Sequence, residues 1–597
     1  MRLHAGEGSA DVEAPCVSPA RRPFAVILVV LSALALPASA SEEEPRPPGD
    51  YTQVEGLSQP EHQTRRDVYR VPMDDGIQMY VEVVRPVLDG RYPVILELSP
   101  YHGTAEDRSG THILPWPEAG GEPLGLAGYF APRGYSVAFA DLRGTGRSQG
   151  CLDYLGPKDR ADAYDIVEWL GSQPWSSGRV GMTGHSYDAM AAIMTAAVAP
   201  PHLATIAPSA GAPRMYDHLF QDGVPYLGTW TGAAAAYELI AWQRHLPPTP
   251  VEISIFGASG DNFGNDMQYA GCGATQTAGT TGASYLTGAE TDWHRARDHS
   301  DGFRVADIPV FHVQATHDAA TRTSTMPPFT ARDNPEDKLW FGQWHHGSTD
   351  FPYPNDRFAQ WTGALHAWFD RHLQQRDVDT GPPVEMFLNG AGKVVTAEEW
   401  PLPETSSLTL YPTAGGSLAA SPGPAGTLGY DASPAAWFYG APPVPSSEPD
   451  RLSFVSTPMA RDTLIAGSPT LRLRLSITSP RVDIMATLWD LDPAGEDAEK
   501  IGQAVFAMNP ELRAGIDRPQ PVTPGQEMVL DMKGMDQAHL LEAGRYLALT
   551  VASADIDKTP VFAQGARVTL SLGGAQPAAL TLPVVEEPLL WDDPLGP

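Results

Sequence analysis

Short apolar runs alternate with amphipathic helical runs in this sequence, and this alternation limits the fold more than any other feature. Residues 94–98 and 137–140 are apolar runs of strand length, whereas apolar positions in residues 159–170 recur at the helical spacing of three to four. Strands that alternate with helices form a parallel sheet with helices packed on both faces. The sequence therefore predicts an α/β fold with a doubly wound sheet over residues 68–373.

The pattern changes at residues 374–383, a polar stretch that we interpret as a linker. Beyond it the helical spacing nearly disappears. Residues 470–478 alternate between apolar and polar side chains, with Leu471 and Leu473 expected inward and Arg472 outward. This alternation, together with frequent glycine and proline turns, is typical of an antiparallel β-sandwich. We predict an all-β sandwich over residues 384–597.

A second interruption lies inside the α/β region. Residues 213–303 are rich in Gly, Thr, Ala and aromatic side chains, and they separate two predicted strands. We interpret this stretch as an insertion that caps the carboxyl edge of the sheet, where ligands of such folds bind.

The N-terminal segment has the features of an export signal. An apolar run over residues 24–36 follows two arginines and precedes Ala-Ser-Ala at 38–40, a cleavage pattern of small residues. The run is too short to span a bilayer as a helix, so a cleaved signal peptide over residues 1–40 is favoured over an uncleaved anchor or a buried helix. This predicts a secreted or periplasmic protein in which residues 41–67 form a mobile leader.

Charge and cysteine content exclude several classes of protein. The 597 residues include 40 Lys and Arg against 72 Asp and Glu, a formal net charge of −32. Nucleic-acid binding requires a basic face that displaces counterions, and so does attraction to anionic lipid, so we expect no nucleic-acid partner and no membrane association after signal cleavage. Three cysteines are too few for a disulfide scaffold or a four-cysteine zinc module. Cys151 and Cys272 could pair in an oxidising compartment or remain two buried thiols.

Residues 179–189 combine a short strand, a sharp turn, a serine and an Ala-rich helix. A nucleophile elbow needs that order, because the turn lifts the serine hydroxyl above the sheet and aims the next backbone N–H at a developing oxyanion. Gly184 is the small residue that the crowded turn requires before Ser186, but Asp188 stands where the second glycine of a G-x-S-x-G pattern is usual. Ser186 is thus a candidate nucleophile.

Two further polar residues follow predicted strands. Asp318 comes after the predicted strand 310–314, and His346 comes after the predicted strand 339–341. The chain order Ser186, Asp318, His346 is that of α/β-hydrolase triads, and parallel sheets collect their functional groups at the carboxyl ends of strands. Each residue alone is more often a solvated loop residue or a cap, but the order and the context together predict a catalytic triad.

Several motifs of the chain carry a resemblance to a known family. They are Leu98-Ser-Pro-Tyr101, Asp141-Leu-Arg-Gly-Thr-Gly-Arg-Ser-Gln-Gly150, Gly184-His-Ser-Tyr-Asp-Ala189, Ile308-Pro-Val-Phe-His-Val313 with Asp318, and Gly342-Gln-Trp-His-His346. With them, the sequence from about residue 68 onward resembles the hydrolases that include X-Pro dipeptidyl-peptidases, cocaine esterase and α-amino acid ester hydrolases. The resemblance implies an α/β-hydrolase domain followed by a C-terminal jelly-roll domain. The family's nucleophile motif ends in glycine where this chain has Ala189, a mild departure.

Carried over position by position, the resemblance assigns Ser186 as the nucleophile, His346 as the general base and acid, and Asp318 as the carboxylate that orients the histidine. It assigns the oxyanion hole to the Tyr187 backbone N–H and the Tyr101 side-chain hydroxyl. A phenol is a strong hydrogen-bond donor and stabilises negative charge in a dry site. Without the resemblance, Tyr101 would be interpreted as a packing residue at a strand end.

Four residues are candidates for substrate binding. Trp175 and Tyr216 would line an acyl pocket, although aromatic residues of this kind are more often core or cap packing. Asp217 and Asp222 open the predicted cap and would recognise a substrate ammonium group, as in relatives that accept α-amino acyl donors. The alternative for both carboxylates is ordinary surface solvation.

No metal or cofactor site is predicted. His312, His317 and His345 lie close to Asp318 and His346 in sequence, but His312 falls inside a predicted buried strand and no H-E-x-x-H motif is present. The glycines of the stretch after Arg143 resemble a dinucleotide loop, yet the third glycine is one residue late and no helix follows directly. We therefore expect neither a metal nor a nucleotide at the site.

These observations predict a serine hydrolase that cleaves an ester or amide acyl bond through an acyl-enzyme, with a small ester or short peptide as substrate. Dipeptidyl-peptidase members of the family usually carry a large additional N-terminal helical domain, and the short leader of this chain favours an acyl or α-amino acyl ester hydrolase. An X-Pro dipeptidyl-peptidase is the alternative. A non-catalytic carbohydrate- or surface-binding protein, whose sandwich binds the ligand, is an alternative of another class. The sequence leaves a homo-oligomer open.

Overall fold

The computed structural model of the chain describes residues 46–101, 125–226 and 287–593, apart from short stretches at 319, 322–323, 325, 347–356, 389–390, 434–446, 495–496, 503–505 and 555–564. The predicted signal peptide at 1–40, most of the predicted cap at 213–303, and Cys272 lie outside the described residues.

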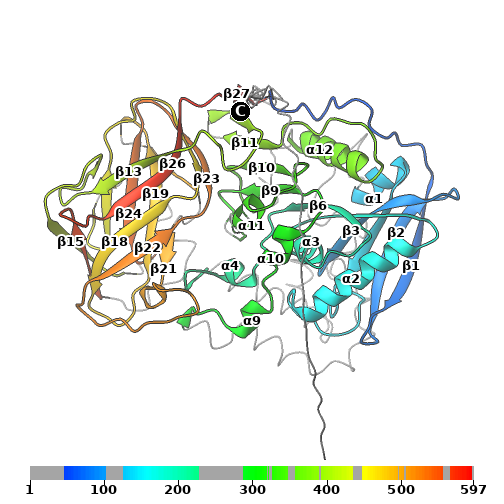
Figure 1. Cartoon of the computed structure of the whole chain (residues 1–597), viewed down its shortest axis with the longest axis horizontal. Helices are drawn as coiled ribbons and strands as arrows, with labels where there is room; N and C mark the ends of the chain where they lie inside the picture. Colours follow the sequence, from blue (N-terminus) through cyan, green and yellow to red (C-terminus); the bar gives the residue numbers. More distant parts are fainter. Residues whose placement is uncertain are drawn as a thin grey trace, which may run out of the picture. The chain divides into compact units, whose positions relative to one another are not determined.

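A mixed sheet of eleven strands is the centre of the N-terminal part of the chain, which we call the α/β domain (Figure 1). The six pairings between β4 and β11 are all parallel, and antiparallel strands continue the sheet at both edges. In spatial order the strands are β1 (Thr64–Pro72), β2 (Gln78–Pro86), β4 (Ser136–Asp141), β3 (Tyr92–Ser99), β5 (Ser176–His185), β6 (Leu203–Ser209), β9 (Phe311–Ala315), β10 (Lys338–Gly342), β11 (Val384–Leu388), β12 (Lys393–Ala397) and β27 (Trp591–Asp592).

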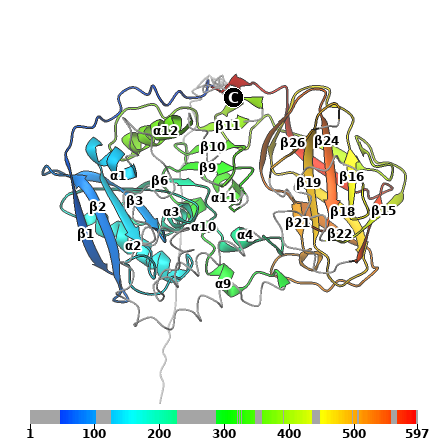
Figure 2. The ribbon, with the colours of Figure 1, turned by 180° about the vertical axis from the view of Figure 1, so that it is seen from behind.

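Helices cover both faces of this sheet, which Figures 1 and 2 show from opposite sides. Along β3, Leu96 packs into a hydrophobic cluster with α2 and α3, whereas its neighbour Ile95 packs into a second cluster with α1 and α12. Because neighbours on a strand point to opposite faces, the two clusters confirm the predicted doubly wound sheet. The helices are α1 (Gly125–Phe130), η1 (Ala131–Arg133), α2 (Pro157–Ser172), α3 (Tyr187–Ala197), α4 (Met215–Leu219), α9 (Asp292–Arg295), α10 (Ser300–Val305), α11 (Met326–Thr330) and α12 (Arg357–His372). Within the described ranges, no helix combines the length and apolar character needed to cross a bilayer.

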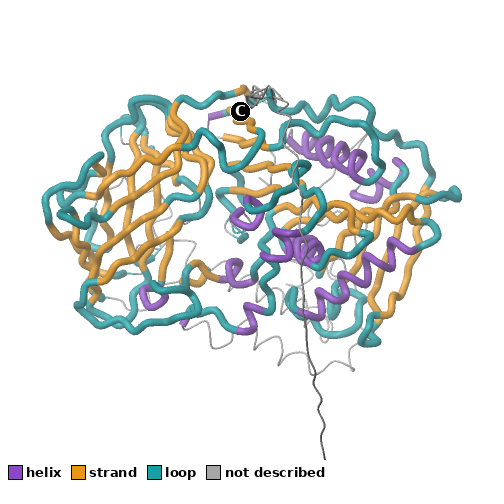
Figure 3. Tube along the Cα trace, viewed as in Figure 1, coloured by secondary structure: helices purple, strands orange, loops and turns teal. Residues whose placement is uncertain are grey.

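The chain from β13 onward, which we call the β domain, consists mainly of strands (Figure 3). One sheet contains β14 (Leu418–Ala419), β13 (Ser406–Pro412), β26 (Ala579–Glu586), β18 (Thr470–Ile477), β25 (Arg567–Leu572), β15 (Gly426–Asp431), β17 (Thr463–Gly467), β22 (Met528–Lys533) and β23 (Gln537–Leu541). The other contains β16 (Arg451–Val455), β24 (Tyr546–Ala552), β19 (Ile484–Leu491), β20 (Ala498–Lys500) and β21 (Phe506–Met508), and a short helix η6 (Pro510–Leu512) follows it.

The two sheets of the β domain share one hydrophobic core. Leu473 of β18 and Leu488 of β19 belong to the same buried cluster although they lie in different sheets. The alternation predicted for residues 470–478 is confirmed, because Leu471 and Leu473 are buried and Arg472 between them is exposed. The domain is therefore a sandwich of two antiparallel sheets.

The boundary between the two domains differs from the prediction. Residue 384 was expected to begin the sandwich, yet β11 starts there and pairs in parallel with β10. β12 and β27 extend the same sheet, and the sandwich begins only with β13 at Ser406. The reason is that β11 is short and four of its five residues are buried, so its sequence carries little of the alternation that distinguishes the two kinds of sheet.

The prediction of a mobile leader at 41–67 is wrong for the described part, from residue 46. Tyr51 is 3% exposed, and its hydroxyl donates to Glu385 Oε2 at 2.5 Å. The Ser58 hydroxyl donates to Asp370 Oδ1 at 2.8 Å, and β1 begins at Thr64. A polar, proline-rich composition predicts solvation, but these polar groups are buried against complementary partners. From residue 46 onward, the predicted leader is therefore part of the α/β domain.

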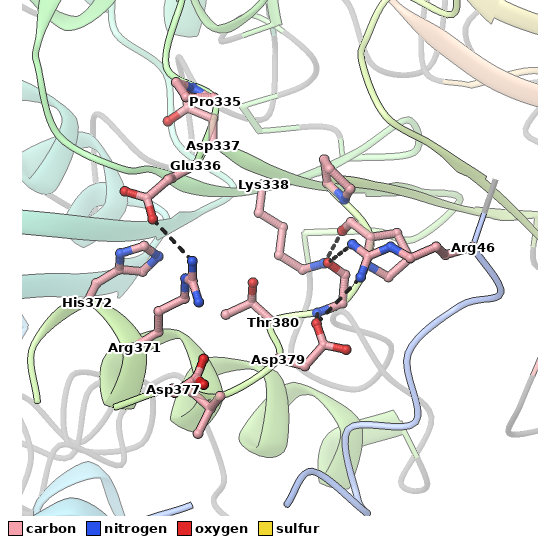
Figure 4. A pocket seen from close by; sticks show the side chains of 14 residues that line it. Arg46, Pro335, Glu336, Asp337, Lys338, Arg371, His372, Asp377, Asp379 and Thr380 are labelled. Atoms are coloured by element: carbon pink, nitrogen blue, oxygen red, sulfur yellow. Dashed lines mark hydrogen bonds and ion pairs between the residues drawn. The ribbon is translucent and has the colours of Figure 1, made fainter. Parts of the chain in front are cut away.

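A pocket of about 410 Å³ opens where β10 begins (Figure 4). Lys338, the first residue of β10, donates to Glu385 Oε2 at 2.8 Å, and both side chains are buried. At the rim, Arg46 of the leader lies 3.6 Å from Asp379. The cations of this pocket thus face carboxylates, and they lie at the amino edge of the parallel strands. We call this group of residues the amino-edge cluster.

Between α4 and α9 the described part of the predicted cap contains a two-stranded hairpin, β7 (Phe220–Gln221) and β8 (Val224–Pro225). The Asp222 carbonyl in its turn accepts a hydrogen bond from the Asn509 N–H at 2.9 Å, and Asn509 Nδ2 donates to the Thr287 carbonyl. The base of the insertion is therefore tied to the β domain.

Candidate active site

Ser186 lies between the end of β5 and the start of α3, in a strained backbone conformation. Its φ of 62° and ψ of −121° are rare for a residue with a side chain. The Ser186 N–H donates to the Ser209 carbonyl at 2.9 Å, while its own carbonyl accepts from the Met190 N–H as α3 begins. A Cβ at Gly184 would lie 2.4 Å from the Asp188 Cβ, so the turn requires glycine there. These are the features expected of a nucleophile elbow.

The departure from the family motif at Ala189 is accommodated by a glycine on a neighbouring segment. Ala189 is fully buried, and a Cβ built on Gly211 would lie 3.1 Å from the Ala189 Cβ. That separation is tighter than ordinary van der Waals contact. Because Gly211 has no side chain, the methyl group of Ala189 fits beneath the elbow without displacing Ser186.

His346 brings the two other predicted polar residues into one chain of contacts. Its Nε2 lies 2.8 Å from Ser186 Oγ, and its Nδ1 lies 2.9 Å from Asp318 Oδ2. The His346 side chain is about one-quarter exposed, whereas the Asp318 side chain is fully buried. The three residues follow β5, β9 and β10, so the carboxyl ends of parallel strands place them together as the sequence predicted.

Asp318 is held as a carboxylate. Besides His346, it accepts hydrogen bonds from the Ala320 N–H, the Thr321 N–H and the Thr321 hydroxyl, at 2.7, 2.9 and 2.6 Å. Burial by itself would raise the pKa of Asp318, but the neighbouring His346 charge and the hydrogen bonds from His346 and Thr321 outweigh burial and lower it well below the ordinary value. The buried carboxylate can therefore fix the proton of His346 on Nδ1, which leaves Nε2 free to accept from Ser186.

His185 packs its ring against that of His346, with the ring centroids 4.7 Å apart. Burial, followed by the neighbouring His346 charge, lowers the pKa of His185 to about 3. A histidine that stays neutral at physiological pH adds no positive charge beside His346, so it can support the imidazole without opposing its protonation.

The two tyrosines predicted for the oxyanion hole follow β3 and β5, which are neighbours in the sheet. Tyr187 is the first residue of α3, where backbone N–H groups point outward along the helix axis. Tyr101 follows β3, whose pairing with β5 joins Leu96 to Met182. The oxyanion-hole roles of the Tyr187 N–H and the Tyr101 hydroxyl remain predictions.

Trp175 is not at this site, and its prediction as a pocket residue is wrong. It precedes β5, so it lies about 30 Å along the strand from Ser186. Its carbonyl accepts from the Tyr92 N–H at the start of β3, and the Arg85 guanidinium lies 5.7 Å from its ring centroid. Trp175 therefore packs at the amino edge of the sheet.

Tyr216 is also a packing residue rather than the predicted pocket residue. It is 1% exposed, its ring stacks on Phe220 with centroids 5.3 Å apart, and its hydroxyl donates to the Gly288 carbonyl at 2.7 Å. These contacts join α4 to the return of the inserted segment. Tyr216 thus stabilises the base of the insertion.

Asp217, one of the two carboxylates predicted to recognise ammonium, has an internal partner. Asp217 lies 3.1 Å from Arg214, whose guanidinium also contacts Glu290 and Asp298. Burial is the main reason that the pKa of Asp217 is raised to about 6, and the Arg214 charge opposes this rise. Asp222 is half-buried in the turn that contacts Asn509. Asp217 is therefore part of a charge network of the protein itself.

Cys151 is disulfide-bonded. The other cysteines of the chain, Cys16 and Cys272, lie outside the described residues, so the predicted pairing of Cys151 with Cys272 remains a prediction.

Two groups of supporting residues were not predicted. Thr321 donates to Asp318, and its position three residues later is a local signal that could have identified it. Gln343, just after β10, contacts His539 of the β domain, and no local signal joins residues so far apart. His539 also lies with Asp490 and Glu499, and ligand-capable atoms of these three residues lie within 4.8 Å of one another. Asp490 is already bonded to His539 and Arg545, so its oxygens have protein partners.

Known proteins resemble the chain at the level of both domains. Residues 75–348 match the X-Pro dipeptidyl-peptidase (S15 family) model, and residues 376–582 match the X-Pro dipeptidyl-peptidase C-terminal non-catalytic domain. A Streptomyces avermitilis protein assigned by name to the Xaa-Pro dipeptidyl-peptidases is 26% identical, covering 89% of this chain and 84% of its own. The cocaine esterase of Rhodococcus sp. (strain MB1 Bresler) is 26% identical, covering 82% and 90%.

Solved structures show the same fold. An α-amino acid ester hydrolase superposes with a TM-score of 0.66 at 21% identity, covering 92% of this chain and 100% of its own. A CocE/NonD family hydrolase from Staphylococcus aureus superposes with a TM-score of 0.66 at 20% identity, covering 87% and 94%. These structures show the fold alone, whereas the two family models show that the chain combines a serine hydrolase domain of the S15 type with the C-terminal domain of X-Pro dipeptidyl-peptidases.

Proposed function

We propose that this chain is an exported serine hydrolase that cleaves acyl ester bonds with Ser186, His346 and Asp318. The observation that carries the proposal is the continuous contact from Ser186 Oγ to His346 Nε2 at 2.8 Å and from His346 Nδ1 to Asp318 Oδ2 at 2.9 Å. A nucleophile, a base within hydrogen-bond reach and a third group that orients the base are together the requirement for covalent acyl transfer.

In the proposed reaction His346 Nε2 accepts the proton of Ser186 as Oγ attacks the carbonyl carbon. The resulting oxyanion is stabilised by the Tyr187 N–H and the Tyr101 hydroxyl. His346, held by Asp318, then donates the proton to the leaving alcohol, and an acyl-serine remains. A water molecule, deprotonated by His346, attacks the acyl-serine, and the acid leaves as Ser186 recovers its proton.

Esters are favoured over peptides because the leaving alkoxide departs more easily than an amine and because Asp217, predicted to bind a free amine, is engaged by Arg214. The likeness to cocaine esterase over 90% of that protein's length agrees with this choice. An X-Pro dipeptidyl-peptidase is the second candidate, since the Streptomyces relative carries that name and covers a similar share of the chain.

Export is proposed on the sequence alone, from the apolar run at 24–36 and the small residues at 38–40. Expression of the full chain in a host with a general secretion pathway, followed by N-terminal sequencing of the mature protein, tests it. A new N-terminus at Ser41 in the periplasm or medium supports export, whereas an intact cytoplasmic chain contradicts it.

Catalysis is tested by labelling the purified protein with a fluorophosphonate probe and by assaying a short-chain p-nitrophenyl ester beside Ala-Pro-p-nitroanilide. We expect labelling of Ser186, rapid ester hydrolysis and little release of nitroaniline. Preferential release of nitroaniline would favour the dipeptidyl-peptidase. Absence of labelling and of both activities would contradict a hydrolase and favour the carbohydrate- or surface-binding alternative.

A further inference from the structure

The loop that carries His346 is in contact with the β domain. Gln343 is the first residue after β10 and lies three positions before His346. Its side chain is buried, and its Nε2 lies 2.6 Å from Nδ1 of His539 on β23. The two residues are 196 positions apart in the chain. A residue of the β domain thus binds the segment that positions the candidate general base.

His539 is itself fixed by a charged pair within the β domain. It is 4% exposed, and its Nε2 lies 3.0 Å from Asp490 Oδ2. Arg545 pairs with the other oxygen of Asp490. Because the Gln343 amide donates to Nδ1, the ring proton lies on Nε2, where Asp490 accepts it. One neutral tautomer therefore satisfies both contacts, and the imidazole has a defined orientation.

Other contacts of the loop come from the α/β domain. The Gln343 N–H donates to the Phe387 carbonyl at 3.3 Å, and His345 Nδ1 lies 3.1 Å from the His317 carbonyl. The buried ring of Trp344 lies directly over Gly342, where a Cβ would come within 2.0 Å of it. These contacts hold the backbone, whereas the Gln343 side chain links the start of the loop to the other domain.

We infer that His539 is a positioning residue for His346, an inference that rests on the proposed function. Acting through Gln343, it keeps the loop in the place where His346 Nε2 reaches Ser186 Oγ. Misplacement of a reacting group by about 1 Å can reduce a rate ~100-fold. Since the other loop contacts remain when His539 is removed, we expect a smaller loss, roughly 10-fold in kcat with little change in KM.

The test is a double-mutant cycle on the full-length protein with His539→Ala, Gln343→Leu and the double variant, assayed with a p-nitrophenyl ester. Each single variant should lower kcat about 10-fold. The kcat of the double variant should be no lower than that of the less active single variant, because both changes remove the same link. Hydrogen exchange of the amides at 342–346 should become faster in all three. His539→Gln, which keeps a side chain able to pair with Gln343, should recover part of the rate.

A matched control is His366→Ala. His366 is 1% exposed, lies 3.4 Å from Asp370 and binds Ser58, so it is a comparable buried His–Asp pair without a contact to the loop. It should lower thermal stability while leaving kcat within about twofold. An unchanged kcat in folded His539→Ala, strictly multiplicative losses in the cycle, or an equal loss in His366→Ala would each overturn the inference.

Failure of the proposed function gives a different result. If Ser186→Ala retained esterase activity, the triad would be wrong, yet exchange at 342–346 would still report whether His539 orders the loop. Unaltered exchange at these amides in His539→Ala would overturn the positioning role whatever the activity.

Discussion

The two edges of the parallel sheet contain similar residue types but use them differently, and β10 spans both. At its first residue, Lys338 pairs with Glu385, which also accepts hydrogen bonds from Tyr51 and from Trp340 Nε1. Just past its other end, His346 contacts a serine held at a φ of 62°. The amino-edge cluster binds the leader, whereas the carboxyl edge aligns the half-buried Ser186 with His346. Buried charge alone therefore does not identify a catalytic site; a strained residue aligned with a base does.

Replacing Ser186 with Ala should have the largest effect. Loss of the nucleophile should lower kcat/KM by roughly 10⁶-fold, while the fold remains, because the alanine side chain retains the Cβ of serine. Steady-state ester assays and thermal unfolding measure both. A variant with more than a few per cent of the original activity would place the nucleophile elsewhere.

The second-largest effect is expected for Asp318→Asn, which should reduce kcat about 10⁴-fold. The amide has the shape of the carboxylate but can donate to His346 Nδ1, which favours the tautomer that cannot accept from Ser186. The rate of fluorophosphonate labelling should fall in parallel, since both reactions need a deprotonating base. A loss below tenfold would show that the buried carboxylate is not needed to orient His346.

At the amino edge, Lys338→Met should lower the free energy of unfolding by about 3–5 kcal/mol, because it leaves Glu385 buried without its cation. Activity per folded molecule should stay unchanged. Urea denaturation beside the ester assay separates the two quantities. The matched double variant Lys338→Met with Glu385→Gln should be more stable than the single variant. A loss of kcat that exceeds the unfolded fraction would contradict the separation of the two edges.

Tyr101→Phe should reduce kcat by about 100-fold or more, the effect of removing one oxyanion donor. KM and unfolding temperature should change little, because only the hydroxyl is removed. Tyr92→Phe, a tyrosine at the opposite end of β3, is the control and should retain full activity. Equal rates for both variants would remove Tyr101 from the oxyanion hole.

The smallest expected effect is a pH dependence of stability. Because the pKa of Asp318 is lower in the folded protein than in the unfolded chain, the unfolded state binds the extra proton as pH falls. The stabilisation is fully present above the ordinary pKa, near pH 4, and is lost as pH falls through the lowered folded value. Urea unfolding at pH 6 and at successively lower pH, for wild type and Asp318→Asn, measures it. The stability difference between them should shrink toward low pH, and a constant difference would contradict the lowered pKa.

Features that depend on local sequence could be predicted. The parallel strands, the elbow at Ser186 and the order of Asp318 and His346 all follow from short patterns, and each lies at the predicted strand end. The alternation in β18 likewise fixed which leucines are buried.

Features that depend on partners distant in the sequence could not be predicted. Tyr51 and Ser58 appear to belong to a solvated leader until Glu385 and Asp370 are placed beside them. β11 resembles any short apolar strand until it pairs with β10. Trp175 is an aromatic residue of the kind that lines acyl pockets, but the direction of β5 places it at the amino edge of the sheet. No pattern in the sequence joins His539 to Gln343, because their contact exists only after two domains have docked.

The pairing of β27 with β12 has a consequence for biosynthesis. Trp591 lies opposite Val394, and its Nε1 donates to Thr396 Oγ1 across 195 positions of chain. Synthesis proceeds from the N-terminus, so the whole sandwich is made before the outermost strand of the first sheet reaches its neighbour. A nascent α/β domain therefore exposes the unpaired edge of β12 throughout that interval, and a chaperone that shields this edge would protect the enzyme from aggregation until the last strand closes the sheet.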